Sequence, residues 1–205
     1  MDPGTRANLV KAYDRRASGR DKGDLPDWRK QERERFLALL KEGHKRTLLE
    51  VGAGTGKDSA FFKDNGLQVI STDISPEMAG LCRAKGLPVC LVDFCHLAFV
   101  EESFDAVFAS SCLLHVPKKE LPGVLRDLRA VLKPAGLLFM GMYGGRASEG
   151  IWEDDVYVPK RFFSIYTDGQ IQGIVSALFG VLRFETLQLG EGEPHRQSLI
   201  LRKTG

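Results

Sequence analysis

Residues 48–56 read LLEVGAGTG, and this stretch decides the fold. An apolar strand over Leu48–Val51 runs into three glycines and directly into a predicted helix over Gly56–Asn65, where glycine allows a tight turn and close approach of a ligand. The G-x-G-x-G spacing differs from the G-x-G-x-x-G of dinucleotide-binding loops, and no Gly-Lys-Ser/Thr follows as in a P-loop. Glu50 would repel a pyrophosphate. It would suit a cationic ligand that carries an ammonium and a sulfonium.

Downstream of this loop, short apolar runs alternate with helices. The predicted strands are Leu67–Thr72, Leu87–Val92, Phe104–Ser110 and Leu137–Tyr143, and the predicted helices are Pro76–Ala84, capped by Ser75, and Glu120–Leu132. Continuous apolar strands separated by helices form parallel sheets that are covered on both faces. With right-handed crossovers, the pattern predicts a doubly wound, Rossmann-like α/β fold with helices on both faces.

The residues after Thr167 break this alternation. A helix from Thr167, its predicted cap, to about Phe179 precedes two strands over Val181–Leu189 and Gln197–Lys203, joined by a short loop that includes Gly190–Pro194. Too few residues separate these strands for a helical crossover, so they should pair antiparallel. We therefore expect a parallel sheet with an antiparallel edge.

Length and composition fit a single domain. The chain has 205 residues, of which 43% are hydrophobic and 27% are charged, as in globular proteins. No apolar run approaches the roughly 20 residues that cross a bilayer. The first four residues lack an apolar signal core, so we expect a cytoplasmic protein without membrane association.

The first 46 residues are basic. They carry 13 Lys or Arg against 8 Asp or Glu. Residues 1–24 are expected to form a loose arm with a short helix near Ala7–Arg16, followed by a helix that begins with Asp27 as its N-cap and ends at Gly43. A basic arm could contact an anionic substrate or nucleic acid, but the interleaved acids favour a solvated helix face.

The cysteines do not indicate a metal site. Cys82, Cys90, Cys95 and Cys112 form no C-x-x-C pair. Free cysteine in apolar segments behaves as a small buried hydrophobe. The adjacent pair Cys95-His96 has no partners at ligand spacing, so we expect no bound metal.

Acidic residues also end the second and third predicted strands. Asp73 lies 17 residues after Gly56, where a carboxylate can accept both ribose hydroxyls of an adenosine. Asp93 is placed to accept a hydrogen bond from an adenine amino group, and Ile74 and Phe94 could clamp the adenine faces. Either acid alone could be a loop or capping residue. Together with Glu50 beside a glycine loop, they predict an adenosine site.

These motifs resemble class I S-adenosylmethionine-dependent methyltransferases. LLEVGAGTGKDS (48–59) is similar to their motif I, STDISPEM (71–78) to the second motif, and LVDFCHLAFVEESFDAVFASSCLLHVP (91–117) to the third and fourth. LRAVLKPAGLLFMGMY (128–143) is similar to the helix and fifth strand that follow. The resemblance spans about residues 45–143. Within that family, these motifs most resemble the small-molecule branch typified by ubiquinone and menaquinone biosynthesis enzymes.

The resemblance implies S-adenosylmethionine as cofactor and the strand order 3-2-1-4-5-7-6, with strand 7 antiparallel. It divides the single domain 1–205 into N-terminal arm and helices (1–44), cofactor-binding core (45–143), and substrate-side loop with the C-terminal helix and strands (144–205). The implied cofactor-binding residues are Glu50, Gly52 and Gly54 at the methionine end, Asp73 at the ribose, Asp93 and Phe94 at the adenine, Ser110 beneath the methionine, and Tyr13 closing over the cofactor. Ala53, Gly56 and Ile74 complete the predicted cofactor-binding set.

Two residues after the fourth and fifth strands are candidates for catalysis. His115 could act as a general base or hold the loop before Pro117. Tyr143 ends the fifth strand, at the edge where open α/β sheets bind ligands. The following residues 148–157 mix aromatics with four carboxylates, so they could box an amine or a heteroaromatic ring, or form a solvated acidic loop.

A small-molecule methyl acceptor is the favoured substrate, methylated at O, N, S or C by in-line displacement. The fourth strand lacks an Asn/Asp-Pro-Pro-Tyr/Phe motif, and a pI of 8.3 gives little support for a nucleic-acid surface. The alternative is a protein or RNA methyltransferase that uses the basic arm. A nicotinamide-dependent oxidoreductase and a non-catalytic cofactor-binding module are further alternatives.

Overall fold

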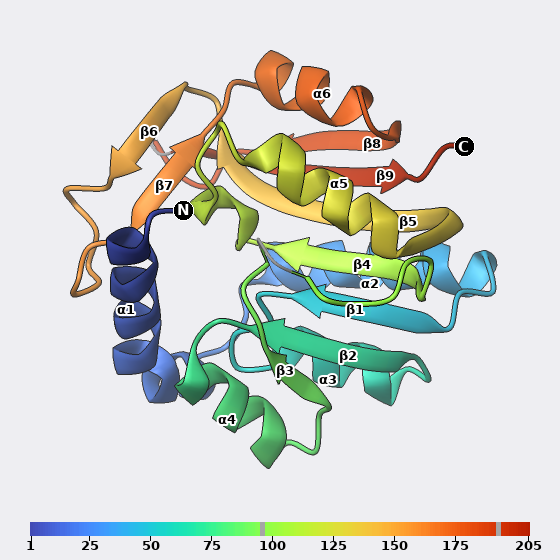
Figure 1. Cartoon of the computed structure of the whole chain (residues 1–205), viewed down its shortest axis with the longest axis horizontal. Helices are drawn as coiled ribbons and strands as arrows, with labels where there is room; N and C mark the ends of the chain where they lie inside the picture. Colours follow the sequence, from blue (N-terminus) through green and yellow to red (C-terminus); the bar gives the residue numbers. More distant parts are fainter. Residues whose placement is uncertain (95–96, 192–193) are drawn as a thin grey trace.

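The computed structural model describes residues 1–94, 97–191 and 194–205. Its centre is a seven-stranded sheet in the order β3-β2-β1-β4-β5-β9-β8 (Figure 1). The strands are β1 Thr47–Val51, β2 Gln68–Asp73, β3 Val89–Leu91, β4 Phe104–Ser110, β5 Leu132–Gly144, β8 Gly180–Leu187 and β9 His195–Arg202. The first five are parallel, and β9 is antiparallel to both of its neighbours. With β8 and β9 as the sixth and seventh strands of this sheet, the predicted fold class and strand order are confirmed.

Helices cover both faces of the sheet. The helices of the described chain are α1 Pro3–Lys22, α2 Asp27–Glu42, α3 Lys57–Asp64, α4 Pro76–Ala84, the 3-10 turn η1 Leu113–His115, α5 Leu121–Val131 and α6 Asp168–Ser176, of which α1 lies at the edge of the sheet and not on a face. Because successive strand residues point to opposite faces, Leu48 and Phe108 pack against α2 and α3, whereas Leu49 and Val107 pack against α5 and α6. None of the described helices is long and apolar enough to cross a membrane.

Helix caps follow the sequence at three of four predicted positions. Ser75 accepts a hydrogen bond from the Met78 N–H at the start of α4, Thr167 forms a capping box with Gln170, and Gly43 ends α2. The prediction that Asp27 caps α2 is wrong. Pro26 occupies the cap position without a side-chain hydrogen bond, because Asp27 is already helical.

The N-terminal segment is more ordered than predicted. Residues 1–24 do not form a loose arm, because α1 extends over Pro3–Lys22 and is capped by Asp2. Only three of its side chains are buried apolar groups, Leu9, Ala12 and Ala17. Long-range polar contacts also hold the helix in place, such as the ion pair between Asp21 and Lys85 on α4. The helix lies across the carboxyl ends of the parallel strands (Figure 1).

A second, two-stranded sheet was not predicted. Its strands β6 (Ser148–Ile151) and β7 (Phe162–Ile165) pair antiparallel within the segment that the sequence analysis assigned to a substrate-side loop. The sheet continues the line of β5 beyond the end of the main sheet and approaches α1 (Figure 1). The pair Cys95-His96 lies outside the described residues, within which no group of three or more potential metal ligands occurs.

Candidate active site

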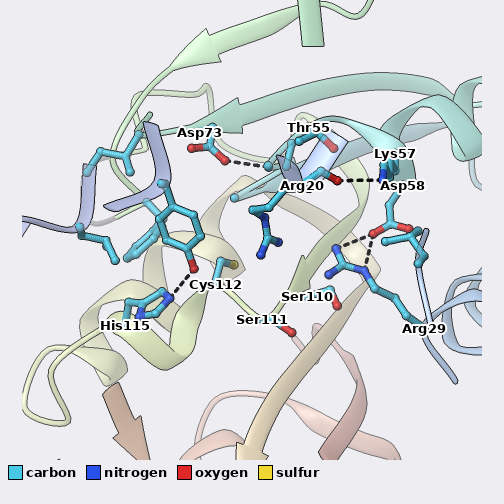
Figure 2. Close-up of a pocket in the computed structure, with 18 residues that line it drawn as sticks. Arg20, Arg29, Thr55, Lys57, Asp58, Asp73, Ser110, Ser111, Cys112 and His115 are labelled. Atoms are coloured by element: carbon cyan, nitrogen blue, oxygen red, sulfur yellow. Dashed lines mark hydrogen bonds and ion pairs between the residues drawn. The ribbon is translucent and has the colours of Figure 1, made fainter. Parts of the chain in front are cut away.

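Two adjoining cavities lie at the carboxyl edge of the sheet, beside α1. The inner cavity is bounded by the glycine loop, the end of β4 and α1, and the outer cavity extends from it to β7 and the segment 152–161. They share seven lining residues: Tyr13, Arg20, Leu25, Arg29, Lys57, Ser111 and His115. The inner volume is about 80 Å³ and the outer about 770 Å³. The Arg20 side chain projects into the middle of the inner cavity (Figure 2), which narrows it.

The glycine loop turns sharply between β1 and α3. Gly52 and Gly54 have φ values of +66° and +57°, in the left-handed region that favours glycine. A Cβ at Gly52 would lie 2.4 Å from the Cβ of Cys112, so packing against the end of β4 excludes a side chain there. A Cβ at Gly54 would meet no atom within 4 Å. The backbone of Gly54 is therefore bare where it lines the inner cavity, and a ligand can approach it closely.

Asp73 ties the glycine loop to the end of β2. Its Oδ2 accepts a hydrogen bond of 2.7 Å from the Gly54 N–H, and its Oδ1 accepts one of 2.9 Å from the Ser75 N–H. Burial raises the pKa of Asp73 above its usual value, although these two N–H donors act in the opposite direction. A carboxylate has lone pairs for about four hydrogen bonds. Asp73 can therefore hold the loop and still accept hydrogen bonds from a ligand in the inner cavity.

Most of the predicted cofactor-binding residues line the inner cavity. They are Tyr13, Gly52, Ala53, Gly54, Asp73, Ile74, Phe94 and Ser110. Asp93 instead forms a 2.9 Å ion pair with Arg6 of α1 and borders a neighbouring hollow that Ile74 also lines. Gly56 does not line the inner cavity, because it faces Cys82 and Leu87 on its other side. Its expected contact with the cofactor is therefore not supported by its position.

Glu50 is not among the residues that line the inner cavity, so its predicted place at the methionine end stays a prediction. The alternation of β1 directs Leu49 and Val51 to the α5 face of the sheet and Glu50 to the opposite face, beneath α3. There its carboxyl group accepts a hydrogen bond from the Ser59 hydroxyl. Burial, reinforced by the nearby charge of Asp58, raises the pKa of Glu50 to about 8. Glu50 therefore joins β1 to α3 through this hydrogen bond.

The sequence analysis missed the basic residues of the site. Arg20, Arg29 and Lys57 line both cavities. Arg29 donates two hydrogen bonds, of 2.9 and 2.6 Å, to Asp58 (Figure 2). Asp58 also pairs with Arg33 at 3.2 Å. Two of these residues come from the basic first 46 residues, whose charge was interpreted as a solvated face. The excess of positive charge in residues 1–46 could have indicated that Arg20 and Arg29 belong to the site.

Tyr13, His115 and Arg161 form a directed hydrogen-bond chain across the outer cavity. His115 Nδ1 lies 2.7 Å from the Phe162 carbonyl oxygen, which can only accept, so Nδ1 carries the proton. Nε2 then accepts from the Tyr13 hydroxyl at 2.7 Å (Figure 2), and the Tyr13 oxygen accepts from Arg161 Nη1 at 3.1 Å. Burial raises the pKa of Tyr13 against the nearby charges of Arg161 and Arg20.

These contacts bear on the two roles left open for His115. Both ring nitrogens are hydrogen-bonded, and burial together with the Arg161 charge lowers the pKa of His115 to about 3, against the opposing hydrogen bond to Phe162. In this arrangement the imidazole takes up no proton near neutral pH. Its contacts join α1, η1 and β7, which fits the structural alternative. Tyr143, the other candidate, lines the outer cavity.

A fully buried arginine supports the end of β4. Arg196 of β9 forms two hydrogen bonds to the Glu32 carboxylate, of 3.1 and 2.9 Å. Its remaining donors reach the hydroxyls of Ser111 at 2.8 Å and Ser110 at 3.0 Å. Ser111 has a positive φ of 60° and lines both cavities. This ion pair therefore fixes the hydroxyls that form the floor of the inner cavity.

The carboxylates of the segment 148–157 are mostly engaged with the protein. Asp155 binds Arg161 through both oxygens, at 2.8 and 2.9 Å. Glu153 pairs with Lys160 at 2.8 Å, and Glu149 accepts from the Lys118 N–H. These contacts do not support the hypothesis that this loop boxes an amine with its acids.

Comparison with known proteins gives a domain match for the central part of the chain. Residues 49–140 match the family model described as a methyltransferase domain. The demethylmenaquinone methyltransferase of Renibacterium salmoninarum is 38% identical over 100 residues, which are 47% of this chain. The aligned part covers 40% of that protein and 35–37% of three other curated relatives, so the chain spans well under half of their length.

Solved structures share the fold over the whole chain. The 1,6-didemethyltoxoflavin-N1-methyltransferase of Burkholderia thailandensis, with bound 1,6-didemethyltoxoflavin and S-adenosylhomocysteine, has a TM-score of 0.73 at 21% identity. The similarity covers 98% of this chain and 87% of that one. The DhpI–SAH complex has a TM-score of 0.75 at 18% identity and covers 100% of this chain and 99% of its own. At these identities the likeness establishes the fold.

Proposed function

The chain carries a class I S-adenosylmethionine-dependent methyltransferase domain, and from this premise we propose that it transfers the methyl group of S-adenosylmethionine to a small molecule in the outer cavity. The bare backbone of Gly54 beside Asp73 is the observation that carries the proposal. A loop of this shape lets the cofactor lie against the main chain while a carboxylate accepts its ribose hydroxyls. The inner cavity adjoins the larger one, where an acceptor would bind.

The lining residues fit the cofactor's chemical groups. Phe94 and Ile74 offer apolar contacts for the adenine, next to the hollow bordered by Asp93. Arg20 has no carboxylate partner among the described residues and donates only to the Tyr157 hydroxyl, at 2.9 Å. We assign it to the carboxylate of the methionine part. Because the Arg20 side chain occupies the middle of the inner cavity, it must move aside when the cofactor binds (Figure 2).

Methyl transfer needs placement more than proton chemistry. The cofactor supplies a methyl group that its sulfonium already activates, so the protein must hold an acceptor lone pair in line, about 3 Å away. Ser110 and Ser111, held by Arg196, and the Tyr13–His115 pair provide fixed walls at the junction of the cavities. Helix α1, which already lies across the strand ends, would help to exclude water from this junction. No side chain in this scheme forms a covalent intermediate.

A small-molecule acceptor is supported by the shape of the site. The outer cavity of about 770 Å³ lies within the range of small-ligand pockets, about 300–1,000 Å³. Several basic residues of the N-terminal 46 are engaged internally, Arg6 with Asp93 and Arg29 and Arg33 with Asp58. This leaves less of a basic surface for the alternative, a protein or RNA acceptor. Two similar proteins have names that state small-molecule substrates, demethylmenaquinone and 1,6-didemethyltoxoflavin, and these names also favour a small-molecule acceptor.

Binding of S-adenosylhomocysteine, measured by calorimetry, tests the cofactor site. Asp73→Asn should weaken binding by about 1–3 kcal/mol, because the charged acceptor is lost, whereas Asp64→Asn on the exposed end of α3 should not. Gly54→Ala should abolish binding. Gly66→Ala is the matched control, because Gly66 also has a positive φ of 91° and open space around its Cβ but does not line the cavity.

Transfer itself is tested with a labelled methyl donor in a cell lysate. Label in the small-molecule extract is expected. Label confined to macromolecules would favour the protein or RNA alternative. Affinity for S-adenosylhomocysteine that is unchanged in both Asp73→Asn and Gly54→Ala would refute the site.

A further inference from the structure

Resting on the proposed function, we infer that the acceptor is a flat aromatic molecule that carries a negative charge, with its ring in the outer cavity and its anionic group on Arg146. Neither the fold nor the glycine loop specifies this class. It follows from the rings and charges that line the outer cavity, and from which of those charges are already neutralised.

Aromatic side chains form the walls of the outer cavity. They come from five separate segments and comprise Tyr13, Trp28, Tyr143, Trp152, Tyr157 and Phe163. Trp152 and Phe163 pack edge to face, with ring centroids 5.2 Å apart and an interplanar angle of 75°. Perpendicular rings of this kind form a corner in which a flat ring can meet one face and one edge at once. The walls therefore favour an aromatic or heteroaromatic acceptor.

Positive charge exceeds negative charge on the same walls. The lining cations are Arg20, Arg29, Lys57, Arg146 and Arg161, and the lining acids are Asp24, Asp154 and Asp155. Arg29 is paired with Asp58, which it shares with Arg33, and Asp155 is paired with Arg161. Lys57 donates to the carbonyl oxygens of Arg20 and Gly23. Since Arg20 is assigned to the cofactor, Arg146 is the arginine that remains for the acceptor.

Arg146 lies where it can bind an anion attached to a ring. It follows Gly144 and Gly145 at the end of β5, and its guanidinium lies 5.9 Å from the centre of the Trp152 ring. Within the described part of the chain it has no carboxylate partner. A guanidinium offers five donors in a planar fork that matches a carboxylate. A ring placed against Trp152 and Phe163 would bring its acidic substituent within reach of that fork.

Three catechols that share a ring and differ in charge test the inference. We would titrate 3,4-dihydroxybenzoate, catechol and dopamine into the protein saturated with S-adenosylhomocysteine, using calorimetry or ligand-observed NMR. The anion should bind about tenfold or more tighter than the cation, with the neutral ring between them, as expected for one charged hydrogen-bonded contact. Arg146→Gln should lower the affinity for 3,4-dihydroxybenzoate to that for catechol, and Arg146→Lys should retain part of it.

Two controls separate the possible failures. Arg126→Gln removes the same charge from an exposed position on α5 that lines neither cavity, and should change nothing. Arg146→Gln should leave the affinity for S-adenosylhomocysteine unchanged. Equal or tighter binding of dopamine, no binding of any catechol, or an Arg146→Gln variant that still prefers the anion would overturn the inference. Failure of S-adenosylhomocysteine itself to bind would instead refute the proposed function.

Discussion

Acidification should destabilise this protein through His115, and replacing that residue by asparagine should remove the effect. The pKa of His115 is about 3 in the folded chain, against an ordinary value of 6.5. Between these two values the unfolded chain binds a proton that the folded chain excludes, so stability is highest above pH 6.5 and falls as the pH drops toward 3. At 1.36 kcal/mol per pKa unit, the loss is about 2 kcal/mol at pH 5, with a ceiling near 5 kcal/mol below pH 3.

Asparagine is the sharpest replacement because its side-chain amide can keep one of the two hydrogen bonds. Its N–H₂ can take the place of Nδ1–H and donate to the Phe162 carbonyl, while nothing in the side chain titrates. His44→Asn is the matched control, because His44 is exposed and its positive φ of 52° also suits asparagine. Only the variant at His115 should change the dependence of stability on pH.

The assay is urea denaturation of the wild type and both variants at about pH 7.5 and about pH 5. Between these pH values His115 should lower the free energy of unfolding of the wild type by about 2 kcal/mol. Taking the difference between wild type and variant cancels groups that titrate elsewhere. Glu50 is one of them, because its raised pKa makes stability increase on acidification over the same range. If His115→Asn shows the same pH dependence as His44→Asn, the buried neutral imidazole is refuted.

Three further predictions concern buried charges. Glu50→Gln should become progressively more stable than the wild type as the pH rises from 4.5 to 8, and the difference should then stay constant. Over this range the folded wild type keeps a proton on Glu50 that the unfolded chain releases, so the wild type loses stability while the glutamine variant does not. A difference in unfolding free energy that does not grow with pH would contradict this. Arg196→Gln should cost about 3–5 kcal/mol in denaturant titrations by leaving Glu32 buried without its partner, and adding Glu32→Gln should recover part of the loss. Asp105 is partly buried, which raises its pKa, but the N–H groups of Arg46 and Thr47 and the ammonium of Lys133 hold that pKa well below its usual range. Asp105→Asn should therefore lower the free energy of unfolding by about 1–3 kcal/mol near pH 7. The loss should shrink as the pH falls below 3.8, and denaturant titrations near pH 7 and below pH 3.8 measure it.

The elements that the sequence predicted well are those whose signals are local. Pro76–Ala84 was predicted with the bounds it has, because Ser75 caps it and Pro76 suits its first turn. Phe104–Ser110 likewise is a largely apolar run, interrupted by Asp105, that follows the polar residues 101–103. The glycine loop and Asp73 were found because their spacing reflects the turn itself.

The parts that were missed depend on contacts between distant residues. The length of α1 is set by partners far along the chain, such as Lys85 for Asp21, and its own sequence buries few apolar groups. Strands β6 and β7 pair across an irregular segment that carries no short turn signal. Arg196 lies among the polar residues that begin β9, and nothing near it in sequence indicates that Glu32 will neutralise it. Side chains paired across more than 150 residues leave no local pattern.

The contact between Gly52 and the side chain of Cys112 restricts how this protein can evolve. A side chain at position 52 would place its Cβ 2.4 Å from that of Cys112, so a first mutation at Gly52 meets a clash that no rotamer relieves. Position 112 must lose its side chain before position 52 can gain one. Even then, the φ of +66° at position 52 admits few residues other than asparagine. The order of mutations is thus imposed by geometry, and two loops that are 60 residues apart along the chain are expected to change as a pair among descendants.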